Sequence, residues 1–205
     1  MTRWMLILTL AGWLPICSPH SLQAAWQARG QVSTQDGELP QNGQQAFAEF
    51  LDRVHAYVNL RDRLRDGIPP VHHKDKPEQI RTHQQLLAER IQKARKDAKE
   101  SEVFTPGSKN AFRQEIEKVF SGKHARSVKK TLVQGEPVRL DLYINKAYPE
   151  KIPITTVPPT LLQHFPTLPK GLEYRVVGSD LILQDVESRL VVDIFRDAFP
   201  NAPPG

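Results

Sequence analysis

Residues 171–199, GLEYRVVGSDLILQDVESRLVVDIFRDAF, decide the fold of this chain. They contain three apolar, β-branched runs separated by two short turn signals. Gly178-Ser179 is a two-residue loop led by glycine, as a type II′ hairpin turn requires. Asp185 and Ser188 bound a second turn, where short polar side chains can bond to their own backbone. The segment therefore predicts a three-stranded antiparallel meander over residues 172–177, 180–184 and 189–195.

A sheet of this size is marginally stable alone and needs a hydrophobic cover on one face. The first predicted helix supplies part of that cover. It begins at Asn42 as N-cap, with Gln45 as its capping-box partner, and carries apolar residues at helical spacing over about six turns. Gly67 then provides the left-handed residue that ends the helix.

Two further helices follow. Asp75 marks the start of the second, with Pro77 in its first turn, and we expect it to fold back on the first as an antiparallel αα-hairpin. The third begins at Thr105-Pro106 and ends at Gly122.

After Gly122 the pattern changes, and 10 of the chain's 17 prolines follow Glu136. Alternating apolar residues over 138–144 predict a fourth strand, and residues 159–165 predict a short helix. Helices first and strands afterwards indicate an α+β fold. We expect a single domain over 42–205, in which a helical part (42–122) packs on a small antiparallel sheet in a strand-rich part (123–205).

The N-terminus predicts export. Arg3 precedes a short apolar run over 4–16, and Ala24 offers a small residue for cleavage, so residues 1–24 are interpreted as a signal peptide. Cleavage after Ala25 or Ala28 and an uncleaved anchor are the alternatives. A polar leader over 25–41 follows. We expect a periplasmic or secreted protein without a transmembrane span after cleavage.

Cys17 is the only cysteine. A lipoprotein interpretation centred on it lacks the small residues that such a processing site needs. Cleavage leaves a chain without cysteine, which excludes disulfides, zinc–thiolate sites and cysteine nucleophiles. The formal charge of +5 is too mild to indicate nucleic-acid binding.

Acidic side chains are the candidates for catalysis. Asp141, Asp180, Asp185 and Asp193 fall on or beside predicted strands, where paired carboxylates could perform acid–base chemistry. We expect Asp141 and Asp193 on polar, solvated faces, and the other two in local turn hydrogen bonds. No G-x-S-x-G, H-E-x-x-H or P-loop pattern accompanies them.

Histidines are the candidates for metal binding. His72 and His73 form a loop pair, and His83 lies on the following helix. Imidazole suits nickel, copper and zinc, but the spacing matches no established ligand pattern. The sequence therefore names no metal ligand and no cofactor.

A basic run follows the third helix. Four cations could meet an anionic envelope surface, such as lipid headgroups or polyanionic sugars: Lys123, Arg126, Lys129 and Lys130. No aromatic residues alternate with them, as single-stranded nucleic acid would require. They are the chain's candidate binding residues.

Several short motifs occur in a recognisable order, namely FLDRV at 50–54, LLA at 86–88, VFTP at 103–106, VPP at 157–159 and LEYR at 172–175. Together they resemble a family of exported bacterial proteins of unknown function, which implies export but no activity. Separately, the hairpin around Tyr174, Gly178, Asp180 and Val192 resembles the C-terminal hairpin of small periplasmic proteins, including a regulator of nickel and cobalt efflux.

Together these patterns favour a non-catalytic binding or interaction module of the bacterial envelope, partnered by another envelope protein or an anionic surface. An envelope hydrolase using strand-borne carboxylates is the first alternative, and a periplasmic metal-handling protein is the second. No catalytic or cofactor-binding residue is assigned.

Overall fold

The structure is a computed structural model that describes residues 41–72, 74–122, 125–126, 128, 130, 141–149 and 155–199. The chain divides into two units, Met1–Glu38 and Leu39–Gly205, and every described residue belongs to the second. The predicted signal peptide and nearly all of the predicted leader lie outside the described residues.

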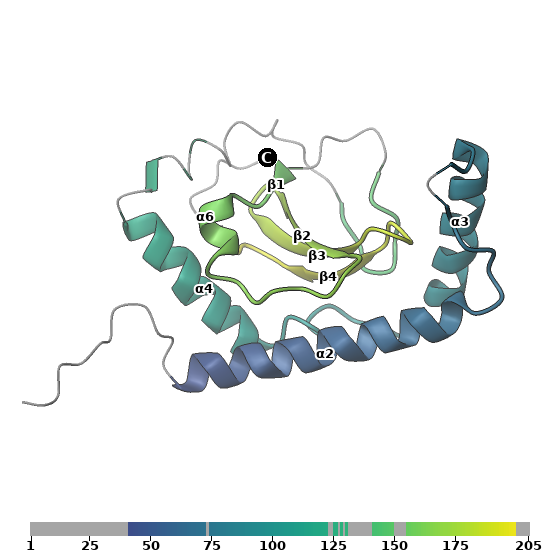
Figure 1. The fold of residues 1–205 in the computed structure, drawn as a ribbon. Coiled ribbons are helices and arrows are strands. Elements are labelled where there is room, and N and C mark those ends of the chain that lie inside the picture. Colours follow the sequence, from purple (N-terminus) through teal and green to yellow (C-terminus); the bar gives the residue numbers. More distant parts are fainter. Residues whose placement is uncertain are drawn as a thin grey trace, which may run out of the picture. The chain divides into compact units, whose positions relative to one another are not determined.

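The fold is α+β, as predicted (Figure 1). Its described helices are α2 (Gln41–Arg65), α3 (Pro77–Ala94), α4 (Pro106–Ser121) and α6 (Pro159–Leu162). Four strands form one antiparallel sheet in the order β1-β2-β3-β4: β1 (Thr155–Thr156), β2 (Leu172–Val177), β3 (Asp180–Asp185) and β4 (Val191–Phe195).

The two turns of the meander form for the reasons that the sequence gives. Gly178 has a φ of 56° while Ser179 keeps a negative φ, the combination that a type II′ turn requires. In the second turn the Asp185 carboxylate accepts the N–H groups of Glu187 (2.9 Å) and Ser188 (3.3 Å). The predicted meander is therefore confirmed, with β3 one residue longer and β4 two residues shorter than expected.

One face of the sheet packs against the helices through an aromatic cluster. Phe112 of α4 lies at its centre, with ring centroids 5.1 Å from Phe50 of α2 and 4.9 Å from Phe165 after α6. Tyr174 of β2 joins the cluster, 5.4 Å from Phe165. All four rings are buried, so this cluster ties two helices and a loop to the sheet.

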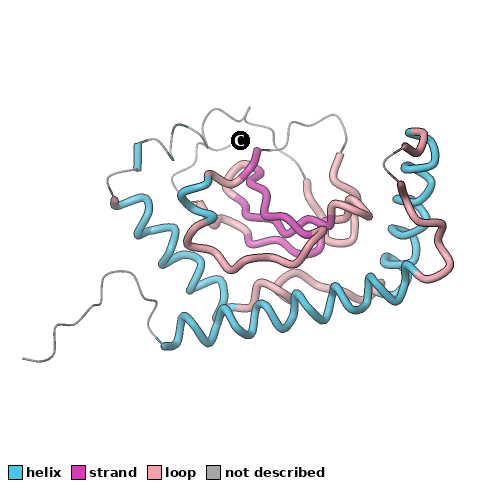
Figure 2. Tube along the Cα trace, viewed as in Figure 1, coloured by secondary structure: helices cyan, strands magenta, loops and turns pink. Residues whose placement is uncertain are grey.

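The other face of the sheet is also covered, which the sequence did not predict. Leu142 and Tyr148 pack there against Ile182, Val191 and Ile194. The covering segment, 141–149, lies beside the outer edge of β4 and is drawn as loop in Figure 2.

The strand predicted over 138–144 is not found where the structure describes it. Residues 138–140 lie outside the described residues, and 141–144 form no strand. Backbone hydrogen bonds to the β4 side begin at Asn145, whose N–H donates to Val191 O (2.8 Å), and continue to Tyr148, whose N–H donates to Arg189 O (3.0 Å). Burial still alternates, since Leu142 is buried between exposed Asp141 and Tyr143. The alternation of apolar and polar residues therefore indicated alternating burial in a segment that has no partner strand among the described residues. The strand that precedes the meander in the structure is β1.

Two helix starts differ from prediction. α2 already includes Gln41, so Asn42 lies inside the helix instead of capping it. Lys76, not Asp75, is the N-cap of α3, and its N–H donates to the Gln79 side chain (2.9 Å). Asp75 instead accepts the N–H of His72 (2.6 Å) in the preceding loop.

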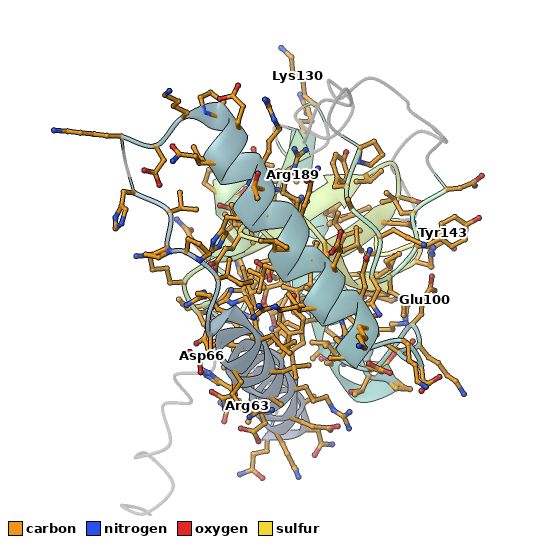
Figure 3. The ribbon with its side chains drawn as sticks, turned by 90° about the vertical axis from the view of Figure 1, so that its right-hand side faces the viewer. Arg63, Asp66, Glu100, Lys130, Tyr143 and Arg189 are labelled. Carbon is orange, nitrogen blue, oxygen red and sulfur yellow. The ribbon has the colours of Figure 1, made fainter. Side chains whose placement is uncertain are left out.

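Four other predicted helix signals are confirmed, whereas the short helix expected over 159–165 already ends at Leu162. Gly67 has a φ of 73°, Pro77 occupies the first turn of α3, and Thr105 caps α4 by accepting the Ser108 N–H (3.3 Å). Gly122 is the C-cap of α4. The expected αα-hairpin is wrong, because α3 stands at a steep angle to α2 instead of lying alongside it (Figures 1 and 3), and its last turns contact the end of α2.

Candidate functional site

The carboxylates singled out in the sequence do not assemble into an acid–base pair. Asp193, expected in water, is fully buried. It accepts hydrogen bonds from three backbone N–H groups of one loop, those of Ser101 (3.0 Å), Val103 (2.7 Å) and Phe104 (2.8 Å). The expectation failed because both faces of the sheet are covered, so β4 has no solvated face.

The other three carboxylates also have plain structural surroundings. Asp185 is fully buried at the β3–β4 turn. Asp180 does not form the expected local turn bond; it accepts instead from two residues that follow β4, from Arg196 Nη1 and from the Asp197 N–H, each at 2.9 Å. Asp141 is exposed, as expected, but it lies in irregular chain.

Of the three histidines that the sequence grouped, the structure describes His72 and His83, which line one pocket but differ in burial. His83 is buried, with Nδ1 2.8 Å from Pro69 O and Nε2 3.0 Å from Glu187 Oε1. Both partners accept hydrogen bonds, so both contacts are complete only when each ring nitrogen carries a hydrogen. His72 is exposed, and His73 lies outside the described residues. Within the described part of the chain, no group of three or more His, Cys, Asp or Glu side chains could hold a metal ion.

The basic run is only partly described. Arg126 and Lys130 are exposed, whereas Lys123 and Lys129 lie outside the described residues. Val128, between them in sequence, is buried. Lys130 extends outward from the ribbon in Figure 3, so at least two of the four candidate cations are accessible.

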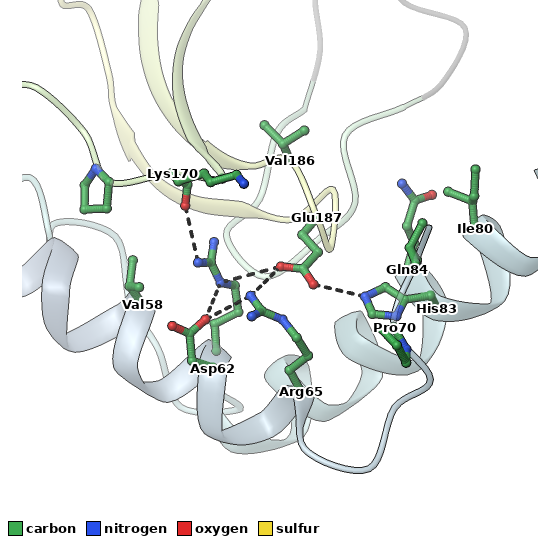
Figure 4. A pocket seen from close by; sticks show the side chains of 14 residues that line it. Val58, Asp62, Arg65, Pro70, Ile80, His83, Gln84, Lys170, Val186 and Glu187 are labelled. Carbon is green, nitrogen blue, oxygen red and sulfur yellow. Dashed lines mark hydrogen bonds and ion pairs between the residues drawn. The ribbon is translucent and has the colours of Figure 1, made fainter. Parts of the chain in front are cut away.

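A cleft of about 710 Å³ lies where α2, α3 and two loops of the sheet meet (Figure 4). Its lining comes from four separate stretches of the chain. These are Val58, Arg61, Asp62 and Arg65 of α2; Pro70, Val71, Ile80, His83 and Gln84 around the start of α3; Pro169–Gly171; and Val186 and Glu187. Only His83 among them was a candidate site residue from the sequence.

The polar part of the lining is a network of ion pairs. Arg65 Nη2 lies 2.6 Å from Glu187 Oε2 and 2.9 Å from Asp62 Oδ1. The other oxygen of Glu187 meets His83. Glu187 thus joins α2 and α3 to the β3–β4 turn, and these side chains hold one another in place.

Arg61 extends this network into the interior. Its side chain is 5% exposed; Nη2 donates to Lys170 O (3.4 Å) and Nη1 lies 3.7 Å from Asp185 Oδ1. Gly171, at a φ of 88°, makes room for it, because a Cβ there would lie 2.7 Å from Arg61 Nη1. Only glycine meets both conditions without strain.

Tyr57 completes the buried end of the network. Its hydroxyl donates to Asp185 Oδ2 at 2.8 Å. Burial, together with the negative charge of Asp185, raises the pKa of Tyr57 far above its ordinary value. The phenol therefore stays neutral and acts as a hydrogen-bond donor. A sequence signal for this arrangement did exist, because Arg61 continues the apolar face of α2 four residues after Tyr57 and seven after Val54.

The rim of the cleft is apolar. Val71 and Val186 are 41% and 42% exposed, and Val58 and Ile80 contribute further aliphatic surface. Lys170 lines the same cleft as Val186 (Figure 4). Among the described residues, no ion pair to its ammonium is found. The cleft thus offers aliphatic walls, a fixed ionic floor and an exposed lysine that forms no ion pair with another described residue.

No family model, curated protein or solved structure matches this chain. None of the described helices is both long enough and apolar enough to cross a membrane. A chain with a single cysteine forms no internal disulfide.

Proposed function

We propose that this protein is an exported, non-catalytic binding module and that the cleft beside Glu187 is its ligand site. One observation carries the proposal: aliphatic side chains surround a concave site of about 710 Å³ whose ionic groups are already fixed by one another. Ligand sites commonly have this size and combination of apolar walls with a few oriented polar groups. The paired state of Arg65, Asp62 and Glu187 favours binding over proton transfer.

The lining also indicates the class of ligand. Val71 and Val186 favour an aliphatic or aromatic group, and the Lys170 ammonium favours an anionic group beside it. We therefore expect an amphiphilic anion, such as an acidic side chain or headgroup with an adjoining apolar portion. This expectation is consistent with an acidic envelope partner.

A fluorescent amphiphilic anion, anilinonaphthalene sulfonate, tests the site. In amide NMR titrations we expect saturable shifts at Lys170, Val186 and Glu187. Lys170→Gln should weaken binding about threefold to tenfold, since one charge contact of roughly 1 kcal/mol is lost. Lys93→Gln, an exposed α3 lysine outside the lining, is the matched control. Equal effects of the two variants, or shifts centred elsewhere, would refute the assignment.

The proposed location needs its own test. Expressed with residues 1–24 in a Gram-negative host, the protein should be recovered from the periplasm with Ala25 as its first residue, as measured by intact mass. An unprocessed chain in the membrane fraction would support the uncleaved anchor instead. The short apolar run after Arg3 and the small residue Ala24 support the periplasmic outcome.

A further inference from the structure

Among the described residues, the outer edge of β2 is only partly paired. β1 contains two residues, and they face Arg175 and Val176 of β2. The chain then reaches Pro158 and Pro159, which lack N–H donors and start α6. Proline cannot extend a hydrogen-bonded ladder, so β1 stops there and residues Leu172 to Tyr174 are left beyond its end.

The register of the meander shows which backbone groups point to this edge. Val186 N–H donates to Gly171 O (2.9 Å), so every second residue from Gly171 bonds to the β3 side. Leu172 and Tyr174 therefore direct their N–H and C=O groups to the outer edge. Leu172 N–H is taken by Pro169 O (3.2 Å). No described residue donates a hydrogen bond to Leu172 C=O, and none accepts one from Tyr174 N–H.

A groove of about 390 Å³ runs beside these groups. Val157, Leu162, Leu168, Leu172 and Tyr174 line it. The Tyr174 hydroxyl donates to Pro166 O (3.1 Å) and so fixes the loop that forms the far wall. The edge thus combines a largely apolar groove with two backbone groups that have no hydrogen-bond partner among the described residues.

We propose that this edge binds an extended segment of a partner protein as an additional strand parallel to β2. In a parallel ladder, one residue donates its N–H to the C=O of residue i−1 and accepts from the N–H of residue i+1. Leu172 C=O and Tyr174 N–H flank Glu173 in this arrangement. A single partner residue opposite Glu173 satisfies both groups.

The side chains specify the segment further. The partner residue opposite Glu173 points to the same face as Glu173, and its two neighbours point to the opposite face, where Leu172 and Tyr174 lie. Those neighbours should be apolar. Glu173 and Arg175 form an ion pair with each other, so they leave no net charge for the central residue to match. The recognised sequence is therefore apolar–uncharged–apolar in extended form.

This inference is independent of the Glu187 cleft, because the groove and the cleft share no lining residue. If peptide binding at the groove is refuted, the proposal for the Glu187 cleft is unaffected, and the reverse also holds. Strand addition of this type obtains affinity from main-chain hydrogen bonds and selectivity from alternate side chains.

The probe is a capped pentapeptide, threonine-valine-threonine-valine-threonine. We expect saturable amide shifts at Glu173, Tyr174 and Leu168 in NMR titrations. The matched control peptide carries an N-methyl group on its central threonine and cannot donate to Leu172 C=O. Its affinity should fall about fivefold or more, because a donor is lost and an acceptor is left unpaired. No saturable shift at millimolar peptide, or equal binding of the two peptides, would overturn the proposal.

Two further measurements fix the location and direction. Leu162 and Leu86 are 45% and 39% exposed, and only Leu162 lines the groove. Leu162→Ser should weaken peptide binding several-fold, and Leu86→Ser should not. A spin label on the peptide N-terminus should broaden signals near Leu172; broadening near Val177 instead would show an antiparallel strand and contradict the inference.

Discussion

Asp185 and Asp193 both lie fully buried in the sheet, yet different parts of the protein compensate their charges. Asp193 is held by backbone N–H groups of the loop before α4. Asp185 is held partly by side chains of α2, namely the Tyr57 hydroxyl and the Arg61 guanidinium. Most substitutions in the loop before α4 keep the backbone N–H donors of Asp193, whereas a substitution of Tyr57 or Arg61 removes a donor of Asp185. The first aspartate thus fixes a loop to the sheet, and the second ties α2 to the wall of the cleft.

The largest effect is expected at the aspartate with backbone partners. Asp193→Ala should lower the free energy of unfolding by about 4 kcal/mol, because several buried N–H groups lose their acceptor at roughly 1–3 kcal/mol each. Urea denaturation measures this loss. Asp141→Ala, at an exposed position, is the control and should change stability by less than about 0.5 kcal/mol. Equal losses of unfolding free energy in the two variants would mean that the hydrogen bonds to buried Asp193 do not stabilise the fold.

A smaller loss of unfolding free energy is expected at Gly171, which makes room for the Arg61 side chain beside Asp185. Gly171→Ala should cost about 2–3 kcal/mol, because it combines a left-handed backbone with displacement of Arg61. Gly178→Ala isolates the backbone contribution, since Gly178 has a positive φ but open surroundings, and should cost about 1 kcal/mol. Thermal or urea unfolding of both variants gives the difference. If the two losses are equal, the close approach of Arg61 to Gly171 contributes nothing.

Removing one side-chain donor of Asp185 should have a still smaller effect. Tyr57→Phe should cost about 1–2 kcal/mol at neutral pH, through one lost hydrogen bond to a buried carboxylate. The difference in unfolding free energy between the wild type and Tyr57→Phe should become smaller above pH 10. Burial raises the pKa of Tyr57 in the folded protein, so unfolding releases a proton once the pH exceeds the ordinary tyrosine value of about 10. Wild-type stability therefore falls with rising pH there.

Urea titrations of the wild type and Tyr57→Phe at pH 7 and pH 11 measure this change. Tyr143→Phe, at an exposed tyrosine, should match the wild type at both values. A constant gap between wild type and Tyr57→Phe would contradict burial of the phenol.

The smallest effect is expected at the half-buried end of the network. Glu187→Gln weakens contacts with Arg65 and His83, but partly solvated ion pairs contribute only about 0–1 kcal/mol. We expect a loss of under about 1 kcal/mol that shrinks with added salt, since salt screens accessible charges. Unfolding in low and high sodium chloride measures it. A loss of unfolding free energy as large as that of Asp193→Ala would contradict this, because it would show that the Glu187 contacts stabilise the fold as strongly as those of a buried carboxylate.

Local patterns were sufficient wherever one turn or cap decided the structure. The Gly178-Ser179 loop and the Thr105 cap could be predicted because their hydrogen bonds join residues within a few positions. Asn42 and Asp75 were misassigned because several neighbouring polar residues could cap the same helix, and sequence alone does not rank them. The strand expected over 138–144 failed for a related reason, since alternating burial does not reveal whether a partner strand is present.

The candidate site was almost invisible in the sequence. Its residues come from four stretches of the chain, and none of them forms a motif of its own. Asp193 was expected in water because the second cover of the sheet, residues 141–149, could not be foreseen. Arg61 left one signal, a charged residue on an apolar helix face, but its partners Asp185 and Lys170 lie more than a hundred positions away.

The sequence by itself determined the three-stranded meander, the helices upstream of it and most of their ends, because these depend on local backbone preferences and short-range hydrogen bonds. Only the tertiary structure decided the steep packing of α3, the cover on the second face of the sheet and the cleft beside Glu187. Those features depend on which distant surfaces exclude water from one another, and on which buried charges find partners once they do.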